Sequence, residues 1–125
     1  MTEHDEQAAV IAWARLMGGS WPCLDWLHAI PNGAQFGMDK RLASIQYNKL
    51  KAEGLTPGIP DLFLPFPSRG YHGFYIEMKR PGNENGVSDR QRAFMEYAEK
   101  VGYLCQVHDN ADGAIEALEW YLEIQ

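Results

Sequence analysis

Residues 59–64 (IPDLFL) and residues 74–80 (FYIEMKR) are the two stretches of sequence that decide the fold. Each contains a short run of aliphatic and aromatic residues, which is typical of a buried strand. Residues 67–70 (PSRG) lie between the two runs and include proline, serine and glycine, which favour a turn. We therefore expect a β-hairpin, with strands over residues 61–65 and 73–79.

This hairpin would bring charged side chains together at one end. In an antiparallel pair, the start of the first strand lies beside the end of the second, so Asp61 and Glu77 would meet at one edge of the sheet. Lys79 is two residues after Glu77 and would project from the same face. Taken separately, Pro-Asp is typical of a turn and Glu-x-Lys of a solvated ion pair. Taken together, the three groups are costly to bury without a shared purpose.

A divalent cation would provide that purpose. Mg²⁺ is commonly held by one or two carboxylates together with waters and phosphate oxygens. A metal at this edge of the sheet would stabilise the charge that develops on a phosphate during in-line attack, and Lys79 would orient or deprotonate the attacking water. The hairpin therefore predicts metal-assisted phosphodiester chemistry.

Helices and further strands are expected around the hairpin. Apolar spacing predicts helices over residues 3–17, 38–53 and 110–124, and a fourth helix from a capping box at residues 88–91 to a glycine at 102. Strands are expected at residues 26–29 and 103–108. This order predicts a single domain over residues 1–125, of the α/β (α+β) class, with a mixed sheet and helices on its faces. The aromatic residues Trp13, Trp26, Phe94 and Trp120 are expected in the core.

The distribution of charge bears on the partner. The chain has 125 residues and a net charge of −6, which by itself argues against a nucleic acid. Residues 40–92, however, hold nine basic and five acidic residues, so the centre carries +4 and the two flanks together carry −10. Two interpretations stay open, an ordinary charged surface and a basic face that attracts phosphates.

Composition also bears on location. The apolar runs are far shorter than the roughly 18 residues that a membrane span needs, and the start of the chain lacks a signal-peptide pattern. Cys23 and Cys105 are too few for a disulfide scaffold and are expected as reduced thiols. We expect a cytoplasmic protein, in a bacterium or in a host cell if the protein is viral, that is neither secreted nor bound to a membrane.

Seven short motifs, in this order, carry a resemblance to a known family. They are Glu3-x-x-x-Gln7, His28-x-Ile30-Pro31-Asn32-Gly33, Lys51-x-x-Gly54, Gly58-Ile59-Pro60-Asp61-Leu62, Glu77-Met78-Lys79-Arg80-Pro81, Ser88-x-x-Gln91 and Gly102-Tyr103. Through them the chain resembles the VRR-NUC (virus-type replication-repair nuclease) domain of the PD-(D/E)XK superfamily. The resemblance implies a restriction-endonuclease-like fold and Mg²⁺- or Mn²⁺-dependent hydrolysis of DNA phosphodiesters. Some members of this family act as dimers on four-way (Holliday) junctions.

The resemblance also assigns roles to individual residues. Asp61 and Glu77 would bind the metal together with the backbone carbonyl of Met78, and Lys79 would be the catalytic lysine that orients water. Gln91 would project into the same site from the start of the next helix.

The family further places a glutamate on the first helix. Here the family motif points to Glu3, whereas the stripe of helical spacing that contains Val10 points to Glu6. Both glutamates therefore stay candidates for the catalytic site.

DNA contacts are expected from six residues that lie in or near these motifs: Lys51, Arg80, His28, Asn32, Arg90 and Arg92. Phosphate contacts fix position without reading sequence, and nothing in the chain resembles a base-reading helix or zinc finger. We therefore expect a structure-selective DNA endonuclease. Because one chain has one site, symmetric cutting of two strands would require a homodimer. The alternatives are a flap or single-strand nuclease on the same fold and a non-catalytic DNA-binding module.

Overall fold

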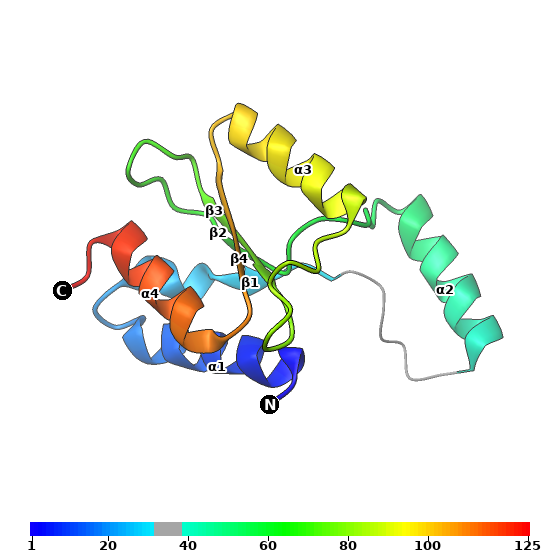
Figure 1. Cartoon of the computed structure of the whole chain (residues 1–125), viewed down its shortest axis with the longest axis horizontal. Coiled ribbons are helices and arrows are strands. Elements are labelled where there is room, and N and C mark those ends of the chain that lie inside the picture. Colours follow the sequence, from blue (N-terminus) through cyan, green and yellow to red (C-terminus); the bar gives the residue numbers. More distant parts are fainter. Residues whose placement is uncertain (32–38) are drawn as a thin grey trace.

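The computed structural model describes residues 1–31 and 39–125. It contains a four-stranded sheet with helices on both faces (Figure 1). The elements are α1 (Glu3–Met17), a short 3₁₀ helix η1 (Pro22–Trp26), β1 (His28–Ala29), α2 (Lys40–Ala52), β2 (Leu62–Leu64), β3 (Phe74–Met78), α3 (Asp89–Lys100), β4 (Leu104–His108) and α4 (Ala111–Leu122). The mixed α/β fold expected from the sequence is confirmed.

The sheet is ordered β1-β2-β3-β4 and its strands run in mixed directions. β1 pairs antiparallel with β2, and β2 pairs antiparallel with β3 as the predicted hairpin. β3 and β4 are parallel, with α3 in the connection between them. Leu62 lies opposite Ile76, so the next step of the register places Asp61 opposite Glu77 at one end of the hairpin.

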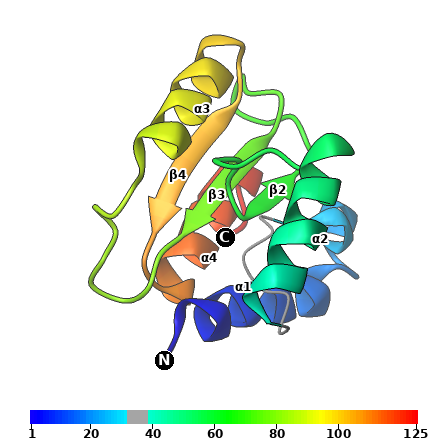
Figure 2. The same ribbon diagram turned by 90° about the vertical axis from the view of Figure 1, so that its right-hand side faces the viewer.

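Alternation along the strands divides the sheet into two packed faces. Leu62, Ile76 and their same-face neighbours are fully buried against α1 and α4, which lie on one side of the sheet (Figures 1 and 2). On the other side, Tyr75 packs against Phe94 of α3 with ring centroids 5.1 Å apart. The ends of β2 and β3 are thus held between layers, which fixes the side chains that follow or precede them.

Trp26 and Trp120 were predicted to lie in the core, and both predictions were wrong. The first strand is also shorter than predicted. The strand expected at residues 26–29 is shortened to His28–Ala29 by η1. In a 3₁₀ helix, residues three apart share a face, so Leu24 and Leu27 are buried while Trp26 is 70% exposed. Trp120 also stays at the surface, where the Arg69 guanidinium lies 4.3 Å from its ring centroid.

The predicted helix at residues 38–53 is α2, which begins after Asp39. The Asp39 carboxylate accepts a hydrogen bond from the backbone N–H of Leu42 and so caps the helix. Within the described parts of the chain, no helix combines the length and the apolar character that crossing a bilayer requires.

Candidate functional site

The site lies at the end of the hairpin where β2 begins and β3 ends. Asp61 precedes β2 directly and is 7% exposed, and Glu77, within β3, is 3% exposed. The Asp61 carboxylate accepts a hydrogen bond from the backbone N–H of Met78, with Oδ2 2.8 Å from N. This bond ties the start of one strand to the end of the other, so both carboxyl groups are held in the same place.

Burial gives this pair of acids an unusual electrostatic state. Burial, together with the nearby Asp61 carboxylate, raises the pKa of Glu77 to about 7, while Lys79 opposes the shift. Burial likewise raises the pKa of Asp61, and the charge of Glu3 adds to that effect. Two carboxylates in this position repel each other, and a cation between them would relieve the repulsion.

Lys79 and Gln91 complete a closed set of contacts around Glu77. The Lys79 ammonium lies 3.2 Å from Oε2 of Glu77 and donates to Oε1 of Gln91 at 2.9 Å. Gln91 in turn donates from Nε2 to Oε2 of Glu77 at 3.0 Å. The Lys79 side chain is only 12% exposed, so its amine is held in one position beside the carboxylates.

The start of α3 explains why Gln91 reaches the site. Ser88 caps the helix by accepting a hydrogen bond from the backbone N–H of Gln91 at 3.1 Å. In return, Oε1 of Gln91 accepts from the backbone N–H of Ser88 at 2.9 Å. The predicted capping box is confirmed, and its glutamine serves the helix end and the acid–amine cluster at once.

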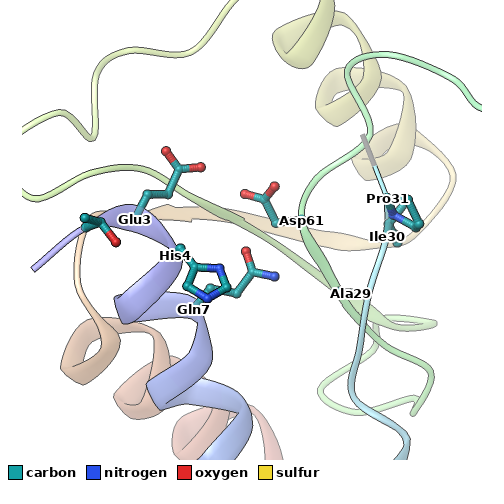
Figure 3. A pocket seen from close by; sticks show the side chains of 8 residues that line it. Glu3, His4, Gln7, Ala29, Ile30, Pro31 and Asp61 are labelled. Atoms are coloured by element: carbon teal, nitrogen blue, oxygen red, sulfur yellow. The ribbon is translucent and has the colours of Figure 1, made fainter. Parts of the chain in front are cut away.

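A pocket of about 380 Å³ adjoins Asp61 and opens between α1 and the end of β1 (Figure 3). Its lining consists of Thr2, Glu3, His4, Gln7, Ala29, Ile30, Pro31 and Asp61. Figure 3 shows the Glu3 side chain on α1 and the Asp61 side chain across from it, both bordering the same space. The structure therefore brings a third carboxylate, from the first helix, to the side of the site.

The structure separates the two glutamates that the sequence left open. Glu6 is buried, and its Oε1 accepts a hydrogen bond from the backbone N–H of Ala111 at 2.8 Å, at the start of α4. Three residues advance a helix by about 4.5 Å, so the two side chains reach different places. Glu3 lines the pocket, whereas Glu6 contacts the start of α4. Gln7 and His4, to which the sequence gave no role, also line the pocket. Gln7 is one helical turn from Glu3, and this spacing is the signal that could have indicated it.

The donor atoms at the site suit a hard cation. Asp61 and Glu77 offer carboxylate oxygens, and the resemblance adds the backbone carbonyl of Met78, whose N–H bonds to Asp61. Among residues 1–31 and 39–125, His, Cys, Asp and Glu side chains form no group of three or more arranged for a metal. Two carboxylates suffice for Mg²⁺ or Mn²⁺ when a carbonyl, waters and substrate phosphate supply the remaining ligands. The residues present therefore fit such an ion.

The residues expected to contact DNA are exposed wherever the structure describes them: His28, Lys51, Arg80, Arg90 and Arg92. Nδ1 of His28 lies 2.7 Å from the Trp26 carbonyl, and the Lys51 ammonium lies 5.5 Å from the Tyr47 ring centroid. Arg90 and Arg92 also have partners within the chain. Arg90 donates from Nε to the carbonyl of Pro57 at 2.9 Å, and Arg92 lies 3.2 Å from the Asp89 carboxylate. Asn32 lies outside the described residues.

Comparisons with known proteins agree with this fold. The family model of the VRR-NUC domain matches residues 1–111. A solved structure described as a VRR_NUC domain protein superimposes with a TM-score of 0.75 and 25% sequence identity, covering 100% of this chain and 91% of that one. The comparison with curated proteins gave no match. The similarity thus covers the hairpin, the pocket and the start of α3 together.

Proposed function

Because the chain belongs to the VRR-NUC domain family, which has a nuclease-type fold, we propose that it is a Mg²⁺- or Mn²⁺-dependent DNA endonuclease. The observation that carries this proposal is the cluster of Asp61, Glu77 and Lys79, in which Lys79 lies 3.2 Å from Glu77 and Asp61 bonds to the adjoining backbone at 2.8 Å. Anionic ligands for a metal and a fixed amine beside them are a combination that can support hydrolysis of phosphodiester bonds.

Each residue would have a distinct task. Asp61, Glu77 and the carbonyl of Met78 would hold the metal, which when bound would supply charge stabilisation at the phosphate. The Lys79 amine, fixed by Glu77 and Gln91, would orient the water whose oxygen attacks phosphorus. The bond between phosphorus and the 3′-oxygen would then break, the water would lose a proton to solvent, and the 3′-oxygen would take one up to leave as a hydroxyl. The products would be a 5′-phosphate and a 3′-hydroxyl, a polarity that the family resemblance implies. Glu3 is the proposed acid of the first helix, since it shares the pocket with Asp61.

We propose further that two copies act together on branched DNA, above all a four-way junction. One chain carries one Asp61–Glu77–Lys79 cluster, and symmetric incision of two strands requires two such clusters related by a two-fold axis. Light scattering tests this idea directly. A mass of two chains is expected, at least when junction DNA is bound, and a single-chain mass with and without the junction would exclude the dimer.

The remaining proposals concern organisation and location. We propose that residues 1–125 form one nuclease domain and that the protein works in the cytosol. Cys23 and Cys105 are both free thiols, a state that a reducing compartment preserves. Fractionation of cells that express a tagged chain would place the protein, and recovery from the periplasm or the medium would contradict a cytosolic site.

The direct test is cleavage of a DNA panel under controlled metal conditions. Four-way junction, flap, single-stranded and linear duplex DNA would each be incubated with Mg²⁺, Mn²⁺ or EDTA. We expect metal-dependent cleavage that is fastest on the junction, and loss of cleavage in Asp61→Asn and Lys79→Ala. Glu96→Gln, which changes an exposed carboxylate on α3, is the matched control and should cut normally.

Three results would count against the proposal. Preference for flap or single-stranded DNA would favour the alternative nuclease. Binding of DNA without cleavage under any metal condition would favour a non-catalytic module. Equal residual cleavage by wild type and Lys79→Ala would trace the activity to a contaminant or to another site.

A further inference from the structure

The proposed site is poorly suited to attract DNA by itself. Glu3, Asp61 and Glu77 surround it, with Lys79 as their nearby cation. The whole chain also carries a net charge of −6. Association with a polyanion is driven largely by neutralisation of phosphates by lysine and arginine. A DNA-binding nuclease of this charge therefore needs a local concentration of cations outside the acid cluster.

Much of the positive charge on the body of the protein is committed to internal contacts. Among residues 1–31 and 39–125, five lysines and arginines bond to carbonyls, carboxylates or an amide of other described residues: Arg15 to Leu24 and Leu27, Arg69 to Trp120, Lys79 to Glu77 and Gln91, Arg90 to Pro57, and Arg92 to Asp89. These groups already have favourable partners, so recruiting them to phosphates would cost those contacts.

The helix α2 carries cations of a different kind. It contains four basic residues, Lys40, Arg41, Lys49 and Lys51, and its 13 residues include no acid. Every residue of α2 is at least partly exposed, and the helix stands beside the layered body (Figures 1 and 2). With α2 at +4, the rest of the chain carries −10, which makes this helix the most strongly basic element of the molecule.

The side chains of α2 also have a suitable order. Lys40, Ser44, Asn48 and Lys51 follow each other at spacings of four, four and three residues, so they form one polar stripe along the helix. All four are exposed, and each can donate to a phosphate oxygen. Lys40 and Lys51 are 11 positions apart, or about 16 Å along the helix, so the stripe is long enough to follow several phosphates of one strand.

The chain connection keeps this helix close to the proposed site. Lys51 precedes Asp61 by ten residues, and the hydrogen bond from Arg90 to the Pro57 carbonyl ties the intervening loop to α3. Resting on the proposed nuclease function, we propose that α2 is a DNA-docking arm whose basic residues bind the phosphate backbone of the substrate beside the incised strand. A sequence-independent contact of this kind would position DNA by shape.

Binding measurements on an inactive background test the arm. In the whole chain carrying Lys79→Ala, the additional changes K40Q/R41Q/K49Q/K51Q would be compared by fluorescence anisotropy on labelled junction and duplex DNA across a salt series. Glutamine is a good helix former, so circular dichroism should show α2 retained. We expect Kd to rise on the order of 100-fold near 0.1 M salt, and the slope of log K against log salt to shrink by about two, because two cations, Lys40 and Lys51, lie in the stripe.

Two matched variants separate charge from other causes. The charge-preserving set K40R/R41K/K49R/K51R should bind DNA as the parent does. Lys100→Gln, which removes an exposed cation at the end of α3, should leave the slope within about one unit. An unchanged affinity and slope in the glutamine set would overturn the proposal.

The alternative to a DNA contact is that α2 forms an interface between two copies of the chain through its apolar residues. Leu42 and Ile45 are 51% and 55% exposed, and they would suit a contact with a second copy. If L42S/I45S converted a dimer to a monomer while the glutamine set left DNA binding intact, α2 would be a subunit interface and the docking arm would be wrong. Cleavage by the wild-type chain is a separate readout. If the glutamine set lost DNA binding in a salt-dependent way but the wild-type chain cleaved no DNA, the docking role of α2 would stand and the proposed nuclease function would be wrong.

Discussion

Gln91 donates a hydrogen bond from Nε2 to Oε2 of Glu77 at 3.0 Å, which joins the first turn of α3 to the last residues of β3. The same amide accepts from Lys79 at 2.9 Å, so a single side chain fixes an acid and an amine relative to each other. The relative position of these two groups therefore depends on where α3 begins, and this dependence can be tested.

Replacement of Gln91 by alanine should lower cleavage much more than it lowers stability. The change leaves Lys79 and Glu77 without their common partner, and we expect cleavage to fall on the order of 100-fold, as for other lost orienting contacts. The free energy of unfolding should fall by about 1 kcal/mol because the capping box loses one bond. Ser88→Ala is the control: it also weakens the cap, and it should retain most cleavage. Equal losses of cleavage in both variants would assign Gln91 a purely structural role.

Changes at Glu3 and Glu6 should have opposite effects: the change at Glu6 should lower stability, and the change at Glu3 should lower cleavage. Glu6→Ala leaves the buried N–H of Ala111 without its partner, so the free energy of unfolding should fall by about 1–3 kcal/mol. Glu3→Gln changes an exposed group and should alter stability by less than about 0.5 kcal/mol, yet it should reduce cleavage. Urea unfolding and cleavage at a temperature where both variants are folded would measure the two effects. Normal cleavage in Glu3→Gln would remove Glu3 from the site.

Stability without metal should depend on pH through Glu77. Its folded pKa of about 7 lies above the ordinary value of 4.5, so the native state holds more protons than the unfolded state between these values. The stabilising contribution is complete below about pH 4.5 and is lost as pH rises through 7, with an upper limit of roughly 3 kcal/mol at about 1.4 kcal/mol per pKa unit.

Urea titrations in EDTA between pH 5 and 8 would measure this loss as the difference between wild type and Glu77→Gln. The comparison is needed because burial lowers the pKa of His108, which favours the folded state as pH rises through the same range. Saturating Mg²⁺ should restore stability to the wild type above pH 7 and have little effect on the variant. A pH dependence that is identical in both proteins would contradict a shared acid site.

The sequence was sufficient for the hairpin and for the juxtaposition of the two acids, because two apolar runs around a turn leave one register in which Asp61 meets Glu77. The start of α3 was also predictable, since Ser88 and Gln91 form a local capping signal. These features depend on neighbours in the chain or on one strand pairing, and such interactions leave a pattern that can be recognised.

Other features depend on how distant elements approach each other. Glu3 and Glu6 lie on the same broad face of α1, and only the position of α4 shows that Glu6 serves Ala111. Trp26 is of a residue type that usually lies in the core, but the geometry of η1 leaves its side chain exposed. The apolar residues of α2 would fit any amphipathic helix, so its separation from the body could not be inferred from the sequence.

The most direct measurement is the affinity of the metal-free protein for Mn²⁺, determined by isothermal titration calorimetry at pH 8. The proteins compared are wild type, Asp61→Asn, Glu77→Gln and the control Glu96→Gln. We predict that wild type and Glu96→Gln bind Mn²⁺ equally, and that each of the other two changes weakens binding at least about tenfold, or about 1.4 kcal/mol. Equal Mn²⁺ affinity in all four proteins would show that Asp61 and Glu77 do not share an ion.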